Sequence, residues 1–296
     1  MAATVMHSML SVPGIRERFI EKARDAEADV LCFDLEDSVA WDDKPAARDL
    51  LCRVLPDFPK RGRQVFVRTN GYDTGLIEQE LDAIVQPWLD GVSVSKIESA
   101  RDVQRIDDYL TLLERARGLP DGQIKIAAWI ENAHAVANAY EICASSERLV
   151  GICVGGEDYA VSIGVRRTKG GAELELARRA SVNAAHAAGI APLDTPWTDI
   201  RDPEGYEDEL RRMKEIGFQG KFCIHPDQLG PANRIFSPPA DDVDWARRVV
   251  DAYQDGVERN LGAVALDGQM IDKPVLEQAE NVLAWSEQIA AMASAR

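Results

Sequence analysis

The sequence has few basic residues for its length. Its 296 residues contain 34 Lys and Arg against 50 Asp and Glu, which gives a formal net charge of −16. Nucleic-acid binding requires a basic surface that neutralises phosphates, so we expect no nucleic-acid partner. The same acidity argues against docking on anionic lipids. An anionic substrate is compatible with it only where basic side chains gather in one cleft.

Long apolar runs and paired cysteines are also missing. No run reaches the length of a transmembrane helix, and the opening residues, MAATVMHSMLSVPG, lack the basic leader and apolar centre of a secretory signal. The five cysteines are scattered and form no CxxC pair, which predicts buried reduced thiols rather than disulfides or a zinc site. We therefore expect a cytoplasmic protein without a membrane partner.

Several catalytic motifs are absent. The sequence has no G-x-S-x-G elbow, no Walker loop and no H-E-x-x-H, and its four histidines lie far apart. The first apolar run is followed by SVPGIRERF and not by G-x-G-x-x-G, which argues against a dinucleotide-binding sheet. Serine-elbow hydrolysis, P-loop chemistry and zincin chemistry are not predicted.

What the sequence does contain is a regular alternation of short apolar runs and longer amphipathic stretches. The short runs are rich in Val, Ile, Phe or Cys, as is typical of parallel strands buried on both faces. Eight such units predict a TIM (β/α)8 barrel, with a doubly wound open sheet as the alternative. The expected strands are His7–Val12, Val30–Asp34, Gln64–Thr69, Gly91–Lys96, Ile124–Ile130, Leu149–Gly155, Ile190–Thr195 and Lys221–His225. Expected helices include Ile15–Ala28, Pro45–Leu55, Ser99–Arg117, Gly171–Ala188 and Pro203–Ile216.

A C-terminal extension follows the eighth strand. Ser237-Pro238-Pro239 is the expected break between a barrel domain, residues 1–236, and this extension, residues 237–296. The extension reads as a helix over Asp241–Asn260, a hairpin over Leu261–Asp272 with an Asp-Gly turn, and an amphipathic helix over Pro274–Ala293.

Polar residues follow most of the expected strands. Catalytic residues of TIM barrels lie at the carboxyl ends of the strands, so these segments should meet on one rim. Most of their charged residues are acids, which repel one another unless a cation neutralises them. The segments are Asp34-Leu35-Glu36-Asp37, Arg68-Thr69-Asn70-Gly71, Lys96-Ile97-Glu98, Glu131-Asn132, Gly155-Gly156-Glu157-Asp158 and His225-Pro226.

Glu131 and Asp158 are the expected metal ligands. They follow consecutive strands, and oxygen-only ligands select a hard cation such as Mg2+. The structural alternative for either acid is a helix cap at a strand–helix junction. Lys96 is expected to pair with the acidic rim, with a Schiff-base role as the less favoured alternative. His225 ends the eighth strand, which makes it a candidate for lining a ligand site.

These strand ends resemble those of the citrate lyase β-subunit-like family, within the metal-dependent HpcH/HpaI aldolases and malyl-CoA lyases. Each motif is weak alone, but their order and spacing are specific for the family. Trp129, Tyr159 and Ser95 depart from the common pattern beside the pocket, which bears on the substrate more than on the chemistry. The matching motifs are SVPG with Arg16 and Arg18, DLEDSV at 34–39, KPAAR at 44–48, VRTNG at 67–71, KIESA at 96–100, GED at 156–158, GK at 220–221, IHPDQ at 224–228 and DGQMIDKP at 267–274.

The resemblance implies a TIM barrel that cleaves or forms a carbon–carbon bond in 3-hydroxyacyl thioesters. It implies Mg2+, or Mn2+, on Glu131 and Asp158, and Arg68 as the clamp for the oxygens of a carboxylate or keto acid. It further implies that the C-terminal extension is a lid whose Asp272 reaches a neighbouring subunit's site, in a trimer or hexamer.

The expected activity is cleavage of a CoA thioester such as malyl-CoA or citramalyl-CoA into acetyl-CoA and a 2-keto acid. Arg68, Asp272, Glu36 and Asp37 are the catalytic candidates. The CoA phosphates are expected on Arg16, Arg18 and Lys22 near a helix start, with His225 also counted as a cofactor contact. The alternatives are a malyl-CoA-type thioesterase, a citrate lyase β subunit acting on an acyl-carrier protein, and a non-catalytic CoA-ester-binding subunit. The lid stretch at 267–274 favours a stand-alone CoA-ester lyase.

Overall fold

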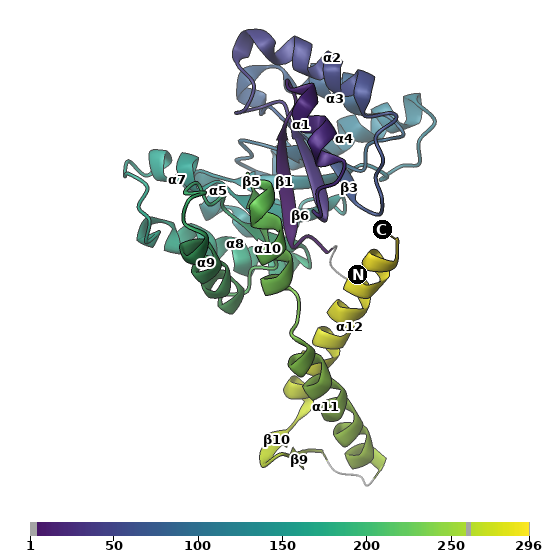
Figure 1. Cartoon of the computed structure of the whole chain (residues 1–296), viewed down its shortest axis with the longest axis vertical. Coiled ribbons are helices and arrows are strands. Elements are labelled where there is room, and N and C mark those ends of the chain that lie inside the picture. The colour runs from purple at the N-terminus through teal and green to yellow at the C-terminus, as the bar shows by residue number, and fades with distance from the viewer. Residues whose placement is uncertain (1–4, 259–261, 296) are drawn as a thin grey trace. The chain divides into compact units, whose positions relative to one another are not determined.

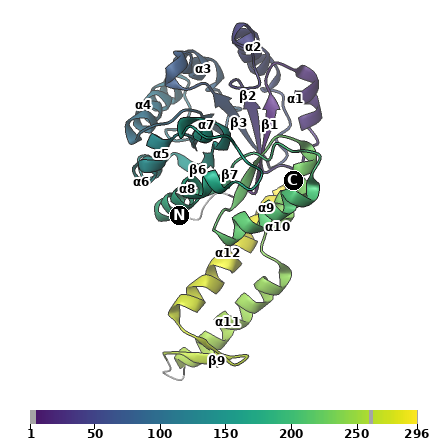
Figure 2. The same ribbon diagram turned by 90° about the vertical axis from the view of Figure 1, so that its left-hand side faces the viewer.

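The computed structural model describes residues 5–258 and 262–295, and its core is a closed barrel of eight parallel strands. The strands follow one another in chain order around the barrel, β1 pairs with β8, and helices surround them (Figures 1 and 2). The predicted TIM barrel is confirmed. The strands are β1 Ser8–Pro13, β2 Val30–Asp34, β3 Gln64–Thr69, β4 Gly91–Val94, β5 Lys125–Ile130, β6 Leu149–Val154, β7 Ala191–Asp194 and β8 Gly220–Cys223.

Side-chain alternation divides the strand residues into two layers. One set of alternate residues packs inside the barrel, and the other packs outward against the helices, because successive side chains of a strand point to opposite faces. The barrel therefore buries both faces of every strand, which explains the near-continuous apolar runs. The inner cluster includes Met9, Cys32, Phe66, Trp129, Cys153, Leu193 and Phe222.

The helices agree with the sequence pattern where amphipathic stretches are long, and Ser99 caps α4 as expected through a capping box. The first expected helix is shorter than predicted, because α1 spans only Glu17–Ala23. Short helices after β3, β5, β6 and β8 carry too few turns to show periodicity, so the pattern did not reveal them. The helices of the barrel are α1, α2 Lys44–Val54, α3 Ile77–Ile84, α4 Ala100–Ala116, α5 Ala133–Ala137, α6 Ala139–Cys143, α7 Gly156–Ser162, α8 Glu175–Ala188, α9 Pro203–Glu215 and α10 Leu229–Phe236.

Strand β4 ends at Val94, two residues earlier than predicted. The backbone turns immediately after it, and Lys96 has a φ of 58°, in the left-handed region that few non-glycine residues adopt. Because of this turn, both the Lys96 side chain and its N–H group point toward the acids at the carboxyl end of the barrel. Strained backbone of this kind persists only where surrounding contacts hold it.

The chain divides into two compact units, one ending at Phe236 and one beginning at Ser237. The second unit holds helix α11 (Ala240–Glu258), the strands β9 (Val264–Leu266) and β10 (Gln269–Ile271), and helix α12 (Lys273–Ala295). Its hairpin turns at Asp267 and Gly268, both with positive φ, as the Asp-Gly signal predicts. The ends of the expected helix and hairpin at Asn260 and Leu261 lie outside the described residues. Among the residues described, no helix is long and apolar enough to cross a membrane.

Candidate active site

A cavity of about 370 Å3 lies at the carboxyl ends of the strands. It is lined by the residues that follow the inner cluster by two positions, since these are the next side chains to point inward. The cavity therefore sits where TIM barrels carry their chemistry. The members of this layer are Ser11, Asp34, Arg68, Glu131, Gly155, Thr195 and Ile224.

Arg68 is held at this layer by Asp34. The two residues are register partners on β2 and β3, and the guanidinium donates from Nε to Asp34 Oδ1 and from Nη2 to Asp34 Oδ2, both at 2.7 Å. Both side chains are buried. Burial alone would raise the pKa of Asp34, but the adjacent guanidinium outweighs it and holds that pKa below the ordinary value. This bidentate pair fixes the plane of the fork and leaves Nη1 for other partners.

Glu36 and Asp37 lie around that remaining nitrogen. Arg68 Nη1 is 3.1 Å from Glu36 Oε2 and 3.3 Å from Asp37 Oδ2. Burial raises the pKa of Glu36 to about 8, against the lowering effect of Arg68. Asp37 is exposed and lines the cavity. One cation thus faces three carboxyl groups, and Glu36 holds a proton near neutral pH.

Glu131 and Asp158 converge on the ammonium of Lys96. Lys96 Nζ lies 2.5 Å from Asp158 Oδ1 and 3.8 Å from Glu131 Oε1, and the Lys96 N–H donates to Glu131 Oε1 at 2.5 Å. The expected pairing of Lys96 with the acidic rim is what the structure shows. Burial raises the pKa of Glu131 to about 7. Glu131 is buried with a side-chain exposure of 4%, whereas Asp158 is 45% exposed and accessible from the cavity.

These residues fit a divalent cation. A Cβ at position 155 would lie 2.3 Å from Glu131 Cβ and 2.6 Å from its Oε2, so only glycine leaves room for this carboxylate. The ammonium of Lys96 shows that a positive charge is stabilised between the two acids. In the described chain no three His, Cys, Asp or Glu side chains form a complete metal cage. Two carboxylates alone make an open site, whose other positions water and ligand oxygens would fill.

The floor of the cavity is aromatic. The Trp129 and Phe222 rings meet edge to face at 4.7 Å, and Trp129 Nε1 donates to Ser93 Oγ at 2.9 Å. The Arg68 guanidinium lies 5.2 Å from the centre of the Trp129 ring and 5.8 Å from that of Phe222. This cation–π contact supports Arg68 from the barrel interior.

The other predicted site residues do not join this cluster. Arg16, Arg18 and Lys22 are exposed at and along α1. His225 does not line the cavity: its Nδ1 accepts the Asp227 N–H and caps the short helical turn that follows. Asp272 belongs to the second unit.

Sequence reasoning missed two members of the inward layer. Asp34 was noted only as part of an acidic strand end, although register with Arg68 makes it the direct partner. Thr195 was included in the seventh strand but not considered for the site. Counting two residues on from the last inward apolar residue would have selected both, since that period determines which side chain faces the cavity.

The fold and this layer define a class: a TIM barrel with an acidic site at the carboxyl ends of its strands. Residues 7–226 match the family model HpcH/HpaI aldolase/citrate lyase. The chain belongs to this family, as the sequence motifs predicted.

Curated relatives cover nearly the whole chain. The citrate lyase subunit beta of Escherichia coli is 36% identical over 280 residues, 95% of this chain and 93% of that protein. An L-malyl-CoA/beta-methylmalyl-CoA lyase of Cereibacter sphaeroides is 34% identical over 304 residues, 94% of each protein. A (3S)-malyl-CoA thioesterase of the same organism is also 34% identical, over 96% of this chain and 95% of that protein.

Among solved structures, the protein CitE from Mycobacterium tuberculosis is similar along its whole length. The match has a TM-score of 0.75 and 32% identity, and it covers 97% of this chain and 99% of the other. That structure is a complex with magnesium, acetoacetate and coenzyme A.

Proposed function

We propose that the protein is a Mg2+-dependent carbon–carbon lyase that cleaves, or in reverse forms, a 3-hydroxyacyl-CoA thioester. The products are acetyl-CoA, or a related acyl-CoA, and a 2-keto acid. The observation that carries this proposal is the convergence of Glu131 and Asp158 on one cation position beside Arg68, in a barrel whose relatives are lyases of such thioesters.

The cleavage requires a proton transfer and a stabilised charge. The 3-hydroxyl loses its proton, the bond between C2 and C3 breaks, and its electron pair passes to the thioester enolate, which then takes a proton at C2. Mg2+ held by Glu131 and Asp158, with Mn2+ as a substitute, would polarise the oxygens of the departing keto acid. Arg68 is the proposed electrostatic clamp, because Asp34 fixes the plane of its fork. Its Nη1, which contacts Glu36 and Asp37 here, would exchange these partners for substrate oxygens.

Asp37 is the proposed acceptor of the hydroxyl proton, and Glu36, which holds a proton near neutral pH, is the proposed proton donor beside it. Both lie beside Arg68 Nη1, and burial raises the pKa of Glu36 to about 8, so at neutral pH Glu36 can donate a proton. Burial is the main cause of that raised pKa, so closing the site around a substrate would raise the pKa of Glu36 further.

The charges that line the cavity favour a keto acid with a single carboxylate. Among the described lining residues Arg68 is the only base, beside Asp34, Asp37, Glu131, Glu157 and Asp158. A second substrate carboxylate would face these acids without a cation of its own. This supports a malyl-CoA- or citramalyl-CoA-type substrate over a citryl thioester.

A panel of thioesters tests the function. Purified protein with Mg2+ is offered malyl-CoA, citramalyl-CoA and citryl-CoA, and keto acid, acyl-CoA and free thiol are each measured. We expect keto acid and acetyl-CoA in equal amounts from the first two. Free thiol without keto acid would instead establish hydrolysis, the second candidate function, which the thioesterase relative favours. Rapid turnover of citryl-CoA alone would contradict the single-carboxylate argument.

Asp272 is proposed to protonate the enolate carbon in a neighbouring subunit, within a homotrimer or hexamer. It caps α12, because Asp272 Oδ1 accepts the Val275 N–H at 3.3 Å. Asp272→Asn keeps this cap and removes the acid, so it should be stable but inactive. Mixing it with Glu131→Ala under demonstrated subunit exchange should restore some activity. A mixture that stays inactive would contradict catalysis in trans.

All five cysteines are free thiols, and four of them, Cys32, Cys143, Cys153 and Cys223, are buried. Burial raises the pKa of Cys32 and Cys223 to about 12, so these thiols are unreactive. Unpaired thiols of this kind support a reducing compartment, and we propose a cytoplasmic location.

A further inference from the structure

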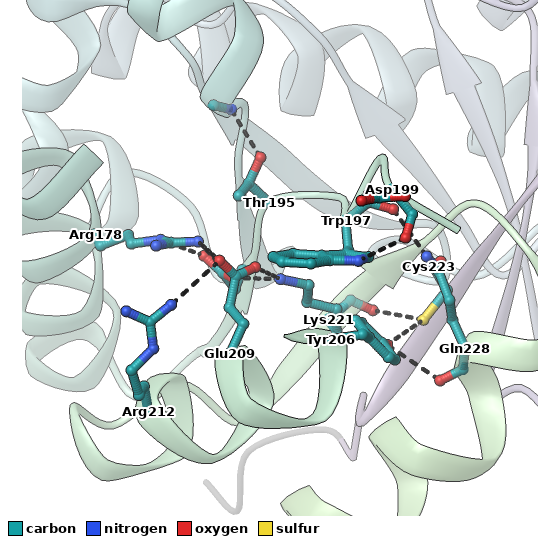
Figure 3. A network of polar contacts seen from close by, with 12 residues as sticks. Arg178, Thr195, Trp197, Asp199, Tyr206, Glu209, Arg212, Lys221, Cys223 and Gln228 are labelled. Atoms are coloured by element: carbon teal, nitrogen blue, oxygen red, sulfur yellow. Dashed lines mark hydrogen bonds and ion pairs between the residues drawn. The ribbon is translucent and has the colours of Figure 1, made fainter. Parts of the chain in front are cut away.

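Thr195 joins the cavity to the helix that carries Asp158. It immediately follows β7, is 1% exposed and belongs to the inward layer that lines the cavity. Its Oγ1 accepts the Gly156 N–H at 3.0 Å, a hydrogen bond across two neighbouring strand ends (Figure 3). Gly156 is the first residue of α7, whose N-terminal N–H groups have no partners within the helix.

The contact between Thr195 and Gly156 is tight. A Cβ at position 156 would lie 2.7 Å from Thr195 Oγ1 and 2.9 Å from Leu174 Cδ1, so glycine is required here. Gly155, at the N-cap position of α7, makes no side-chain cap, and its N–H donates to Ile130 O at 3.0 Å. Thr195 therefore supplies the side-chain cap that α7 does not have of its own. Asp158 is the third residue of this helix, so its direction follows the first turn.

Thr195 is itself held from behind by a buried charge network. Asp194 points outward from the same strand end, where Arg178 donates to it at 2.8 and 3.1 Å and Lys221 at 2.5 Å. Glu209 completes the network, 3.1 Å from Arg178 and 2.5 Å from Lys221. Figure 3 shows Thr195 next to this network. Lys221 and Arg178 outweigh burial and lower the pKa of Asp194, so it stays ionised and paired.

The segment after Thr195 is anchored as well. Trp197 O accepts the Gln228 side-chain amide at 2.8 Å, and Gln228 O accepts the Tyr206 hydroxyl at 3.1 Å. Trp197 Nε1 closes the loop by donating to Asp199 O at 2.9 Å. Thr195 is therefore fixed on both sides, and its hydroxyl is a rigid reference point for α7.

We propose that Thr195 is a positioning residue for the metal-binding acids. Through the Gly156 N–H it fixes the first turn of α7, and this turn sets the direction in which Asp158 presents its carboxylate beside Glu131. The inference rests on the proposed function in one respect, that the two acids bind Mg2+. It gives a role to the buried, charge-balanced network that lies directly behind Thr195 at the end of β7.

Three variants test the proposal. Thr195→Val keeps the shape and removes the acceptor, Thr195→Ser keeps the hydroxyl, and Thr74→Val removes a hydroxyl that accepts another rim N–H, that of Leu76 at 3.2 Å. Mg2+ affinity is measured by calorimetry, and amide hydrogen exchange is measured in peptides covering α7 without metal. We expect Thr195→Val to bind Mg2+ roughly tenfold more weakly, as the loss of one buried hydrogen bond implies, with faster exchange in α7. Thr195→Ser and Thr74→Val should stay close to the unaltered protein in both measurements.

The two measurements separate this proposal from the proposed function. Unchanged exchange in Thr195→Val overturns the positioning role, whatever its Mg2+ affinity. Faster exchange with unchanged Mg2+ affinity also overturns it, because the stability of α7 would then have no effect on how the two acids bind Mg2+. If the unaltered protein takes up no Mg2+, the proposed function fails, and faster exchange limited to Thr195→Val still supports the capping of α7 by Thr195.

Discussion

Two charged clusters of this barrel differ in their ratio of acidic to basic side chains. The mouth cluster, at the carboxyl ends of the strands, sets five carboxyl groups against the two cations Arg68 and Lys96. The outer network, between the barrel wall and the helices, pairs Asp194 and Glu209 with Arg178 and Lys221. The acids of the mouth cluster are Asp34, Glu36, Asp37, Glu131 and Asp158.

The imbalance shows in the pKa values. Burial raises the pKa of Glu36 to about 8 and that of Glu131 to about 7, because two cations cannot compensate five acids. In the outer network the cations outweigh burial, and the pKa of Asp194 is lowered. In a buried cluster with equal numbers of acids and bases every charge is neutralised, and the cluster stabilises the fold. In a cluster with more acids than bases, the excess carboxylates are neutralised only when a further cation binds.

Breaking the outer network should have the largest effect on stability. Lys221→Met leaves Asp194 and Glu209 buried with one cation fewer, so we expect the free energy of unfolding to fall by about 3–5 kcal/mol. Urea denaturation measures it. The control is Arg212→Met, because Arg212 lies 3.9 Å from Glu209 and is half exposed. That change should cost less than about 1 kcal/mol, and equal losses in the two variants would contradict the comparison.

Removing an acid from the mouth cluster should leave stability intact and strongly weaken metal binding. Glu131→Gln takes away a buried carboxyl group with a raised pKa, so the metal-free protein should be at least as stable at neutral pH. Mg2+ affinity should fall about a hundredfold or more, since one of two protein ligands is lost. Calorimetry and urea denaturation together decide. Unchanged Mg2+ affinity in both Glu131→Gln and Asp158→Asn would exclude the acid pair as the metal site.

Changing the clamp should affect turnover but not the metal. Arg68→Lys retains a positive charge but loses the planar fork that Asp34 aligns. We expect kcat to fall about a hundredfold, comparable to the loss of one transition-state donor, with Mg2+ affinity within a few fold. Steady-state kinetics beside calorimetry measures both. Near-normal kcat would show that Arg68 does not hold the reacting oxygens.

The mouth cluster should make the metal-free protein less stable as pH rises. Glu36 and Glu131 have folded-state pKa values of about 8 and about 7, above their ordinary 4.5, so the folded state binds more protons than the unfolded chain in this window. Stability therefore falls between about pH 5 and about pH 8, by several kcal/mol. Urea denaturation across this range measures it. The double variant Glu36→Gln/Glu131→Gln should flatten the slope, and an unaltered slope would assign it to other groups.

The smallest effect is expected at the exposed basic residues of α1. Arg16→Glu combined with Arg18→Glu should raise KM for CoA thioesters by roughly tenfold, because CoA phosphates need local positive charge on an acidic protein. The control is Arg179→Glu, an exposed arginine of α8 paired within its own helix. An unchanged KM in the double variant would place the CoA phosphates elsewhere.

Sequence periodicity was enough to predict the barrel and the gathering of polar residues at the carboxyl ends of its strands. Eight apolar runs and the polar residues behind them predicted the strands and the meeting of Glu131, Asp158 and Arg68 at one end, and the resemblance of the ordered motifs predicted the family. The chemistry-bearing residues were found because parallel strands bring all their carboxyl ends to the same side. The short helix α7 and the early end of β4 were not predicted, since neither leaves a periodic signal.

Contacts between distant residues were beyond the sequence alone. That Asp34 and not Glu36 takes Nε and Nη2 of Arg68 depends on strand register, and the pairing of Lys96 with two acids depends on a left-handed backbone turn. The role of Lys221 is the plainest case, because in the sequence it is a single lysine in a short strand. Only packing of α8 and α9 on the barrel wall shows that it is buried and paired. Local pattern determines which residues turn inward or outward, whereas the pairing of charges is decided by which strands and helices the closed barrel places side by side.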